Sequence, residues 1–248
     1  MLFSVITITK DDEEAFKVTC RSVLEQDFEF QWIIKDGSEA SDYTTELETK
    51  SGLIIERSAD TGIYDAMNQG VLIANGEYII FMNSGDRFAS KNTLTDISKL
   101  IDDRNVDVFY GNHLLNQGNC LPLRRTAKPI WQMNFRMPFS HQSCFIKKQL
   151  LTENKFKTGF GSAADYGFLL GLFDNHARFR DLGMDISIID VNGISNRSRI
   201  KSIMSRMKFV LKGNNLFFVI LRVIFNFSCL IRETIRLLTL SILPRRHH

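Results

Sequence analysis

Three aspartates stand at corresponding places in the sequence, and together they could hold a cation. Asp36 ends one apolar stretch, Asp60 follows the next, and Asp86 closes the segment YIIFMNSGD. Each alone has an ordinary explanation, because aspartate is common in turns. Three carboxylates at one edge of a sheet, however, repel one another unless they meet a cation or hydrogen-bond donors. A Mg²⁺ or Mn²⁺ ion uses one or two carboxylates and completes its shell with phosphate oxygens and water.

The sequence lacks the two common glycine-rich motifs for binding phosphates. No GxGxxG follows the first apolar stretch, which argues against a dinucleotide-binding dehydrogenase, and no GxxxxGK[ST] is present, which argues against a P-loop. If phosphates bind to this chain, a divalent ion held by carboxylates is therefore the expected means.

The elements that would position these acids alternate between strands and helices. This alternation predicts an α/β fold with a mostly parallel, Rossmann-like sheet flanked by helices. In such open sheets ligands bind beyond the carboxyl ends of the strands, which is where the three aspartates fall. The predicted strands are 3–9, 30–38, 53–62, 77–86 and 106–112, and the predicted helices are 12–26, 63–76 (closed by Gly76) and 92–104.

Charge is divided unevenly along the 248 residues. Residues 191–248 hold eleven Lys or Arg and a single acid, whereas the first 190 residues hold twenty basic and twenty-seven acidic side chains. The chain is long enough for one large domain with a sizeable core. An acidic body with a basic tail indicates two tasks, and the tail is expected to seek an anionic surface.

The tail contains a long apolar segment, 215–243, with helical periodicity. Charged residues interrupt it too often for a typical transmembrane helix. A basic polar face opposite a broad apolar face instead predicts a helix lying in the interface of an anionic bilayer, within residues 197–243. A helix docked on the body and a dimer-forming helix are the alternatives. The polar residues that share one arc of this helix are Arg222, Asn226, Arg232, Glu233, Arg236 and Thr239.

Four segments, SVITIT, WIIKDGS, ERSADTGIYDAMNQGVLIANGEYIIFMNSGD and PFSHQSCFIKK, resemble glycosyltransferase family 2, the inverting enzymes of the GT-A fold. The resemblance runs over about residues 3–195. It is closest to bacterial members that build exopolysaccharide (the colanic-acid type), capsule or lipopolysaccharide chains. It implies a nucleotide-sugar-binding half at 1–110, an acceptor-binding half at 111–195, and the amphipathic helical tail at 196–248.

The resemblance also implies the residues of the donor site. Thr7 and Thr9 would edge the nucleoside pocket, and the base or ribose would meet the carboxylates of Asp36 and Asp60. Asn83 and Ser84 would contact the nucleotide-sugar, in the place where the family keeps its DxD-type motif. Asp86 remains there as the ligand of Mn²⁺ or Mg²⁺, because Asn83 replaces the first acid. Family frequency favours UDP as the nucleotide.

Inverting transfer needs a second carboxylate that takes the proton of the acceptor hydroxyl. Asp165 lies in the first turn of a predicted helix within 157–177, after small residues that leave space. The family usually has Glu-Asp here, and this chain has Ala164-Asp165. Asp165 is therefore the candidate general base, although an acid at a helix start also has a structural explanation, since the macrodipole favours it.

Four further residues are expected to line the site. By the resemblance, His141 faces the donor phosphates or the acceptor, as a lining residue and not as the base. Arg197 and Arg199 lie in a segment similar to a family loop near the diphosphate, and either could offset phosphate charge; solvated surface arginines are the equal alternative. Trp131 shapes the acceptor cleft or only packs.

The predicted function is transfer of a sugar from a nucleotide-diphosphate donor, foremost a UDP-sugar, to a hydroxyl of a saccharide or lipid-linked saccharide in cell-surface polysaccharide biosynthesis. The expected location is cytoplasmic, peripheral on the inner face of a bacterial membrane, and a homodimer is possible. The replacements at Asn83 and Ala164 leave open a catalytically weakened scaffold. A sugar nucleotidyltransferase would show a basic, glycine-rich loop where this chain has TKDDEE. Nucleic-acid binding is disfavoured, because the tail lacks interleaved stacking aromatics.

Overall fold

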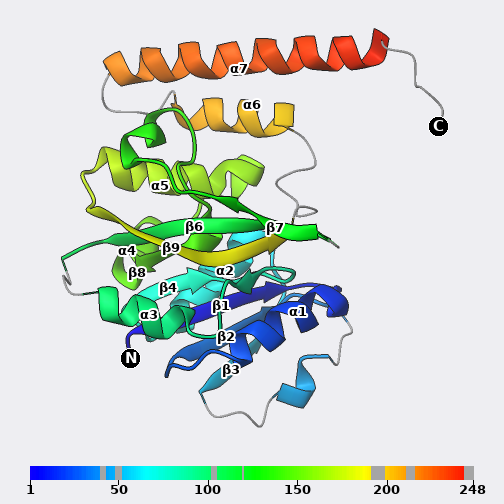
Figure 1. Cartoon of the computed structure of the whole chain (residues 1–248), viewed down its shortest axis with the longest axis vertical. Helices are drawn as coiled ribbons and strands as arrows, with labels where there is room; N and C mark the ends of the chain where they lie inside the picture. Colours follow the sequence, from blue (N-terminus) through cyan, green and yellow to red (C-terminus); the bar gives the residue numbers. More distant parts are fainter. Residues whose placement is uncertain are drawn as a thin grey trace.

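The structure is a computed structural model that describes residues 1–39, 43–47, 52–101, 105–118, 120–190, 199–210 and 216–242. Within these residues nine strands form one sheet, in the order β3-β2-β1-β4-β8-β6-β9-β5, with β7 paired to β6. Figure 1 shows the strands in the lower and middle parts of the molecule, with α6 and α7 stacked beyond them.

The first half of the sheet is parallel, as the sequence predicts. β1 lies between β2 and β4, and β3 pairs with the outer side of β2, all in parallel. Every residue of β1, β2 and β4 is buried, because helices cover both faces of this half. The strands are β1 (Phe3–Thr9), β2 (Gln31–Asp36), β3 (Leu53–Arg57) and β4 (Tyr78–Phe81).

The second half of the sheet is mixed, which the sequence did not indicate. β8 runs antiparallel to both β4 and β6, while β9 returns parallel to β6 and antiparallel to the short β5. The strand predicted at 106–112 is β6, and it continues to Gln117. The strands are β5 (Arg87–Phe88), β6 (Val108–Gln117), β7 (Cys120–Arg125), β8 (Cys144–Lys147) and β9 (Phe179–Asp190).

The three predicted helices of the first half are present. Asp12 caps α1 by accepting a hydrogen bond from the backbone N–H of Ala15 at 3.1 Å. The expected closure of α2 at Gly76 is wrong, since the helix ends at Ile73. Gly76 instead passes close to β1, where a Cβ would lie 2.3 Å from the backbone nitrogen of Ser4. The helices are α1 (Glu13–Leu24), α2 (Ile63–Ile73), α3 (Thr93–Leu100), α4 (Lys148–Asn154), α5 (Ala164–Asp174), α6 (Arg199–Val210) and α7 (Leu216–Ile242), and the 3-10 helices are η1 (Thr45–Leu47), η2 (Ile130–Asn134), η3 (His141–Ser143) and η4 (Thr158–Ala163).

Alternate residues of the central strands feed two hydrophobic clusters, one on each face of the sheet. Ile6 and Ile33 pack in one cluster with side chains of α2 and α5. Val5 and Ile34 pack in the other with side chains of α1 and α3. The period-two alternation along each strand therefore supplies both cores, and the polar carboxyl ends of the strands are left for the site.

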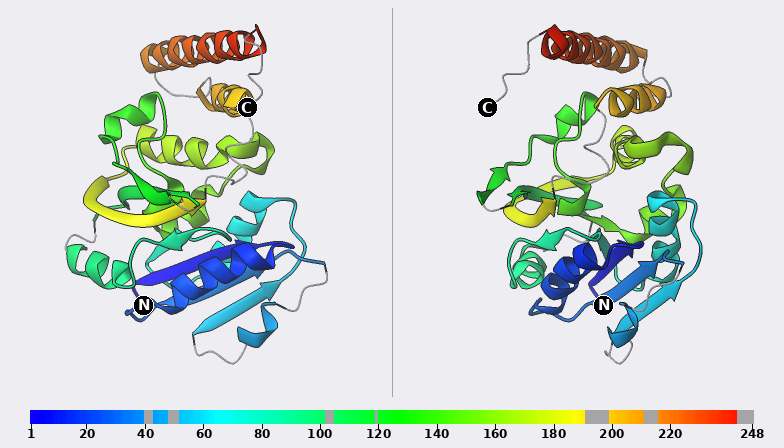
Figure 2. Two further views of the ribbon diagram at one scale, coloured as in Figure 1. Left: turned by 45° about the vertical axis from the view of Figure 1, so that its right-hand side comes forward. Right: turned by 90° about the vertical axis from the view of Figure 1, so that its right-hand side faces the viewer.

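The apolar tail forms α7, the outermost element at the end of the molecule opposite β3 (Figures 1 and 2). Its polar face contacts the body: Arg222 is 2% exposed, and its guanidinium donates to both carboxylate oxygens of Asp174, at 2.9 and 2.6 Å, and to Asn134 Oδ1 at 2.7 Å. Arg222 and Asn226, which the sequence assigned to an exposed polar face of the helix, are instead buried against the protein. Docking on the body, one of the predicted alternatives, is what the structure has.

Replacing Arg222 by alanine is expected to lower the free energy of unfolding by about 3 kcal/mol, since it leaves Asp174 and Asn134 without their buried partner. Urea denaturation of the full chain measures this. Arg236→Ala is the matched control: Arg236 bonds Glu233 at 3.2 Å, but its side chain is 52% exposed, so its loss is expected to change stability by less than about 0.5 kcal/mol. Equal effects of the two substitutions would contradict the role of Arg222 as an anchor.

Candidate active site

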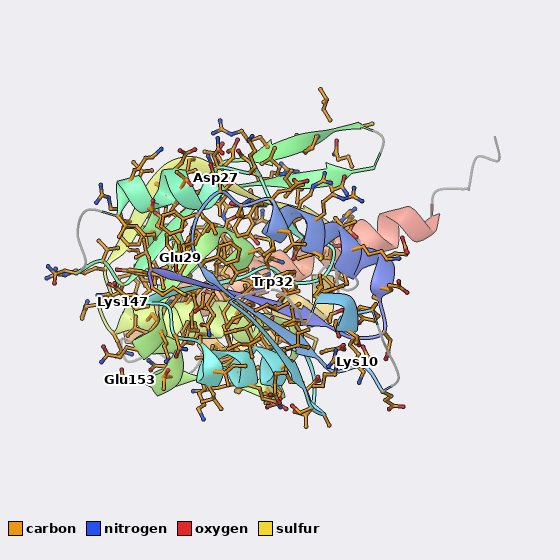
Figure 3. The ribbon with its side chains drawn as sticks, turned by 90° about the horizontal axis from the view of Figure 1, so that it is seen from below. Lys10, Asp27, Glu29, Trp32, Lys147 and Glu153 are labelled. Atoms are coloured by element: carbon orange, nitrogen blue, oxygen red, sulfur yellow. The ribbon has the colours of Figure 1, made fainter. Side chains whose placement is uncertain are left out.

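The carboxyl ends of β1 and β2 meet at one edge of the sheet, where Thr9 and Asp36 are register partners. In Figure 3 Lys10, which directly follows β1, lies at this edge, while Asp27 and Glu29, which precede β2, lie toward the opposite edge. The polar residues that follow β1, β2 and β4 therefore open onto one side of the molecule, as the parallel order requires.

Thr9 begins a chain of hydroxyl groups at this edge. Its Oγ1 lies 2.9 Å from the hydroxyl of Tyr43, which lies 3.0 Å from Ser38 Oγ. Thr7, by contrast, is fully buried, and its Oγ1 accepts a hydrogen bond from Trp32 Nε1 at 3.0 Å. The prediction that Thr7 edges a nucleoside pocket is corrected accordingly, because its hydroxyl is used inside the core.

The carboxylate of Asp60 lies against Gly37, the residue that directly follows Asp36. A Cβ on Gly37 would lie only 2.2 Å from Asp60 Oδ2, so glycine at this position permits the approach. Asp36 is 3% exposed and accepts hydrogen bonds from the Ser38 N–H at 3.0 Å and from Thr44 Oγ1 at 3.1 Å. Asp36 thus organises the loop after β2, while Asp60 is the more accessible of the two acids.

The turn after β4 is fixed to α1. The Thr19 hydroxyl contacts the carbonyl oxygens of Asn83 and Asp86 at 3.0 and 2.6 Å. Gly85 adopts φ = +92°, a conformation that favours glycine, and this closes the turn. Within the described residues, the buried side-chain oxygens of Asn83 and Ser84 have no hydrogen-bond partner. Two buried polar atoms in one rigid turn are an arrangement that a ligand could complete.

Asp86 is 5% exposed and carries a perturbed pKa. Its Oδ2 accepts from Gln142 Nε2 at 3.1 Å, and its Oδ1 accepts from the Asp190 N–H at 3.3 Å. Burial raises the pKa of Asp86 to about 6, with a smaller contribution from the Asp190 charge, and the nearby His141 opposes the shift. A nearby cation would stabilise the charged form of such a buried carboxylate.

Sequence reasoning missed Asp190, the last residue of β9. The carboxylate of Asp190 lies close to the turn after β4, because a Cβ on Gly85 would lie 3.8 Å from Asp190 Oδ2. The only available signal was an acid ending an apolar strand, SIID, which is the pattern that singled out Asp36. The return of β9 beside this turn depends on the mixed half of the sheet, which the sequence did not predict.

Asp165 lies in the first turn of α5, as predicted, and pairs with His141. The distance from His141 Nδ1 to Asp165 Oδ2 is 3.1 Å, and the side chains are 13% and 15% exposed. Asp165 Oδ1 accepts the N–H of Tyr166 at 2.7 Å. The Nε2 atom of His141 is buried without a partner in the described part of the chain. Tyr64 of α2 also lies near this acid: burial and the Asp165 charge raise the pKa of its hydroxyl.

The two acids that matter most therefore meet one short segment of the chain. Asp165 contacts His141, and Asp86 contacts the next residue, Gln142, both in η3. The structure brings together a carboxylate suited to a cation and a separate carboxylate suited to proton transfer, with a histidine between them.

The remaining predicted residues fall elsewhere or outside the described part. Trp131 of η2 is 58% exposed and lies edge-on to Phe135, at a centroid distance of 6.4 Å. Arg197 and the side chain of Arg199 lie outside the described residues. Ala164 is fully buried in the core, so an acid here would be costly, which accounts for alanine at this position.

The residues around Asp86 fit a divalent ion. Asp86 and Asp190 offer carboxylate oxygens, and Asn83 offers a buried Oδ1 that no other described residue bonds. In the described ranges, no group of three or more His, Cys, Asp or Glu is placed to hold a metal alone. An ion here would need oxygens from a second source, and the phosphates of a ligand are the typical supply.

Comparisons with known proteins identify the family and the fold. The family model described as glycosyl transferase family 2 matches residues 4–164. A PGL/p-HBAD biosynthesis glycosyltransferase of Mycobacterium bovis is 26% identical over 185 residues, which is 71% of each chain. An uncharacterized glycosyltransferase of Mycobacterium tuberculosis is 29% identical over 185 residues, which is 67% of each chain.

Solved structures share the fold. S. aureus TarS 1-349 in complex with UDP-GlcNAc matches with a TM-score of 0.67 at 21% identity, over 87% of this chain and 68% of that one. The mannosyltransferase PcManGT from Pyrobaculum calidifontis, in complex with GDP-Man and Mn²⁺, matches with a TM-score of 0.62 at 16% identity, over 85% and 63%. The fold is thus that of GT-A glycosyltransferases. Because the family model matches more than half of the sequence, from β1 to the start of α5, this chain belongs to glycosyl transferase family 2.

Proposed function

We propose that this glycosyltransferase moves a sugar, with inversion, from a nucleoside-diphosphate sugar to a hydroxyl group of a saccharide or lipid-linked saccharide, in the assembly of a cell-surface polysaccharide or glycolipid. The observation that carries the proposal is the meeting of Asp86 and Asp165 at the His141–Gln142 segment. The donor's leaving group and the acceptor's proton need different groups, and these two acids are separate but adjacent.

The donor is proposed to lie over the carboxyl edge of β1, β2 and β4. Thr9, Ser38 and Asp60 surround the nucleoside, while the turn 83–86 and Asp190 face the diphosphate. UDP is the proposed nucleotide, and TarS, of the same fold, binds UDP-GlcNAc. A Mn²⁺ or Mg²⁺ ion held by Asp86 and Asp190 would neutralise the diphosphate charge as the sugar leaves.

Asp165 is proposed to act as the general base. Its carboxylate takes the proton of the acceptor hydroxyl as that oxygen bonds the anomeric carbon, and the bond from this carbon to the phosphate oxygen breaks on the opposite side. The Tyr166 N–H and His141 hold the two oxygens of Asp165 in place. The Nε2 atom of His141, which has no partner among the described residues, is proposed to contact the substrates as a lining group.

The first test is nucleotide binding. At saturating concentration UDP is expected to raise the melting temperature of the full chain by about 5 °C or more, and GDP by less. Added Mn²⁺ should increase the shift only when the nucleotide is present, because the ion needs phosphate oxygens. Release of nucleoside diphosphate across a panel of donors then identifies the sugar. Absence of any shift with UDP, GDP and dTDP, with or without Mn²⁺, would overturn the proposal.

A further inference from the structure

The outer face of α7 carries one continuous apolar stripe, which consists of Ile220, Ile224, Phe227, Ile231 and Ile235. These side chains are between 46% and 61% exposed. Their spacing of three or four residues places them within an arc of about 80°, at about 100° per residue, centred opposite Arg222. We call this set the outer stripe.

Polar contacts on the opposite face of α7 force the outer stripe outward. Arg222 and Asn226 are 2% and 0% exposed, and Arg222 bonds Asp174 and Asn134. Phe225 of α7 also packs against the body, with its ring centroid 5.2 Å from that of Phe135. Rotating α7 to bury the stripe would break these buried contacts. The exposure of five large apolar side chains is thus built into the way the helix is docked.

We propose that the outer stripe seats the protein on an anionic membrane surface, with α7 lying flat between the bilayer and the catalytic body. In the described part of the chain, no helix combines the length and apolar character that a membrane span requires. A docked helix with one apolar face can enter only the interfacial layer. As in the arrangement predicted from the sequence, the apolar face of the helix would meet the lipid, but Arg222 and Asn226 of the polar face contact the body.

Charge favours a membrane over a second copy of the chain as the occupant of this face. Arg232 and Arg236 are exposed toward the C-terminal end of α7, on the side of the helix between the stripe and the Arg222 face, and the single acid of residues 191–248, Glu233, is bonded to Arg236 at 3.2 Å. Two copies meeting through the stripe would bring two strongly basic tails together, whereas anionic lipids neutralise them. The five side chains also expose only roughly 500 Å², less than the ~800 Å² per partner of a typical stable interface.

The contact would also hold the site at a fixed place relative to the bilayer. Asp174, at the end of α5, bonds Arg222 of α7, and Asp165 lies in the first turn of the same helix. An eleven-residue helix spans about 16 Å. Asp165, the candidate base, would therefore lie within about that distance of the end of α5 that is anchored to α7, and the acceptor would react close to the membrane surface. This step rests on the proposed function, and it favours an acceptor carried by a lipid.

The test is co-sedimentation of the full chain with vesicles, without substrates. The wild type is expected to bind vesicles of equal parts phosphatidylglycerol and phosphatidylcholine, and to bind pure phosphatidylcholine weakly. The double substitution Ile224→Ser with Phe227→Ser should lower the partition coefficient on anionic vesicles at least about tenfold. Leu72→Ser is the matched control, since Leu72 is 59% exposed on α2, and it should bind like the wild type.

Three results would overturn the inference: wild-type protein that stays in solution with anionic vesicles, a double variant that binds like the wild type, and a wild-type dimer in sedimentation velocity that the double substitution dissociates. The last result would assign the stripe to self-association. Stabilisation by UDP is measured on the same preparations. If the wild type does not bind vesicles but is still stabilised by UDP, the membrane proposal is wrong and the proposed function is unaffected. The proposed function is tested by the nucleotide measurement alone.

Discussion

Asp165→Asn is expected to lower the rate of sugar transfer by about 10²–10⁴-fold, the range that a positioned general base supplies. The asparagine keeps the size of the side chain and one acceptor oxygen, which suffices for the Tyr166 N–H, whereas its N–H₂ group replaces the oxygen that contacts His141. What is lost is the ability to accept the proton of the acceptor hydroxyl. The loss should appear in kcat, measured as nucleoside diphosphate released with acceptor present.

Donor binding separates this outcome from a general disturbance of the fold. Stabilisation by UDP should be unchanged in Asp165→Asn, since the proposed nucleotide residues lie at the carboxyl edge of β1 and β2. Asp96→Asn is the matched control: Asp96 is also an acid in the first turn of a helix, α3, and its side chain is 51% exposed. It should keep full activity. An active Asp165→Asn enzyme would remove the assignment of the base.

The parallel half of the fold could be predicted from the sequence because its signals are local. β1, β2 and β4 are short apolar runs, buried on both faces, and the segments between them have helical periodicity or turn residues. The mixed half could not, because the direction of β8 and β9 depends on pairing between residues far apart in the chain. The prediction that Gly76 ends α2 failed for a similar reason. Glycine is needed at this position because the chain passes close to Ser4 of β1, a contact between residues far apart in the sequence.

The candidate site was predictable to a similar extent. Acids at the ends of strands were found because their context is visible in the sequence, and Asp86 and Asp165 do converge on one segment. Thr7 could not be distinguished from Thr9 by residue type, and only the packing of Trp32 separates them. The burial of Arg222 was not predicted, because this residue looks like a solvated charge until its partner, Asp174, is known.

Asp86→Asn is expected to reduce sugar transfer at least about 10²-fold, a typical loss when a group that stabilises transition-state charge is removed. The amide carries no charge and holds a divalent ion poorly, so the diphosphate loses its counter-charge. The Mn²⁺-dependent part of the UDP stabilisation should disappear with it, while the part due to UDP alone remains. Full activity, or an unchanged Mn²⁺ effect, would show that the ion, if one is used, is held elsewhere.

The same substitution is expected to stabilise the protein near neutral pH. Burial raises the pKa of Asp86 from its ordinary 3.8 to about 6, so the folded state binds this proton more tightly than the unfolded chain does. The stability that this group contributes is therefore present below about pH 4 and is lost as the pH rises through about 6. At neutral pH the buried charge costs about 3 kcal/mol. Asparagine avoids this cost but forfeits one of the two hydrogen bonds, worth about 1 kcal/mol, which leaves a gain of about 2 kcal/mol.

Urea denaturation of wild type and variant over a series of pH values measures this gain, which should shrink as the pH falls and become a loss of about 1 kcal/mol below about pH 4, where only the forfeited hydrogen bond counts. Asp107→Asn provides a contrast of opposite sign, because Asp107 is held by Lys147 at 3.2 Å and by the Arg178 N–H at 2.8 Å, and its loss should destabilise. A variant at Asp86 that is less stable than the wild type at neutral pH would mean that the carboxylate is kept for the fold. A more stable but inactive variant would mean that Asp86, although its buried charge destabilises the fold, is retained for the ligand it binds.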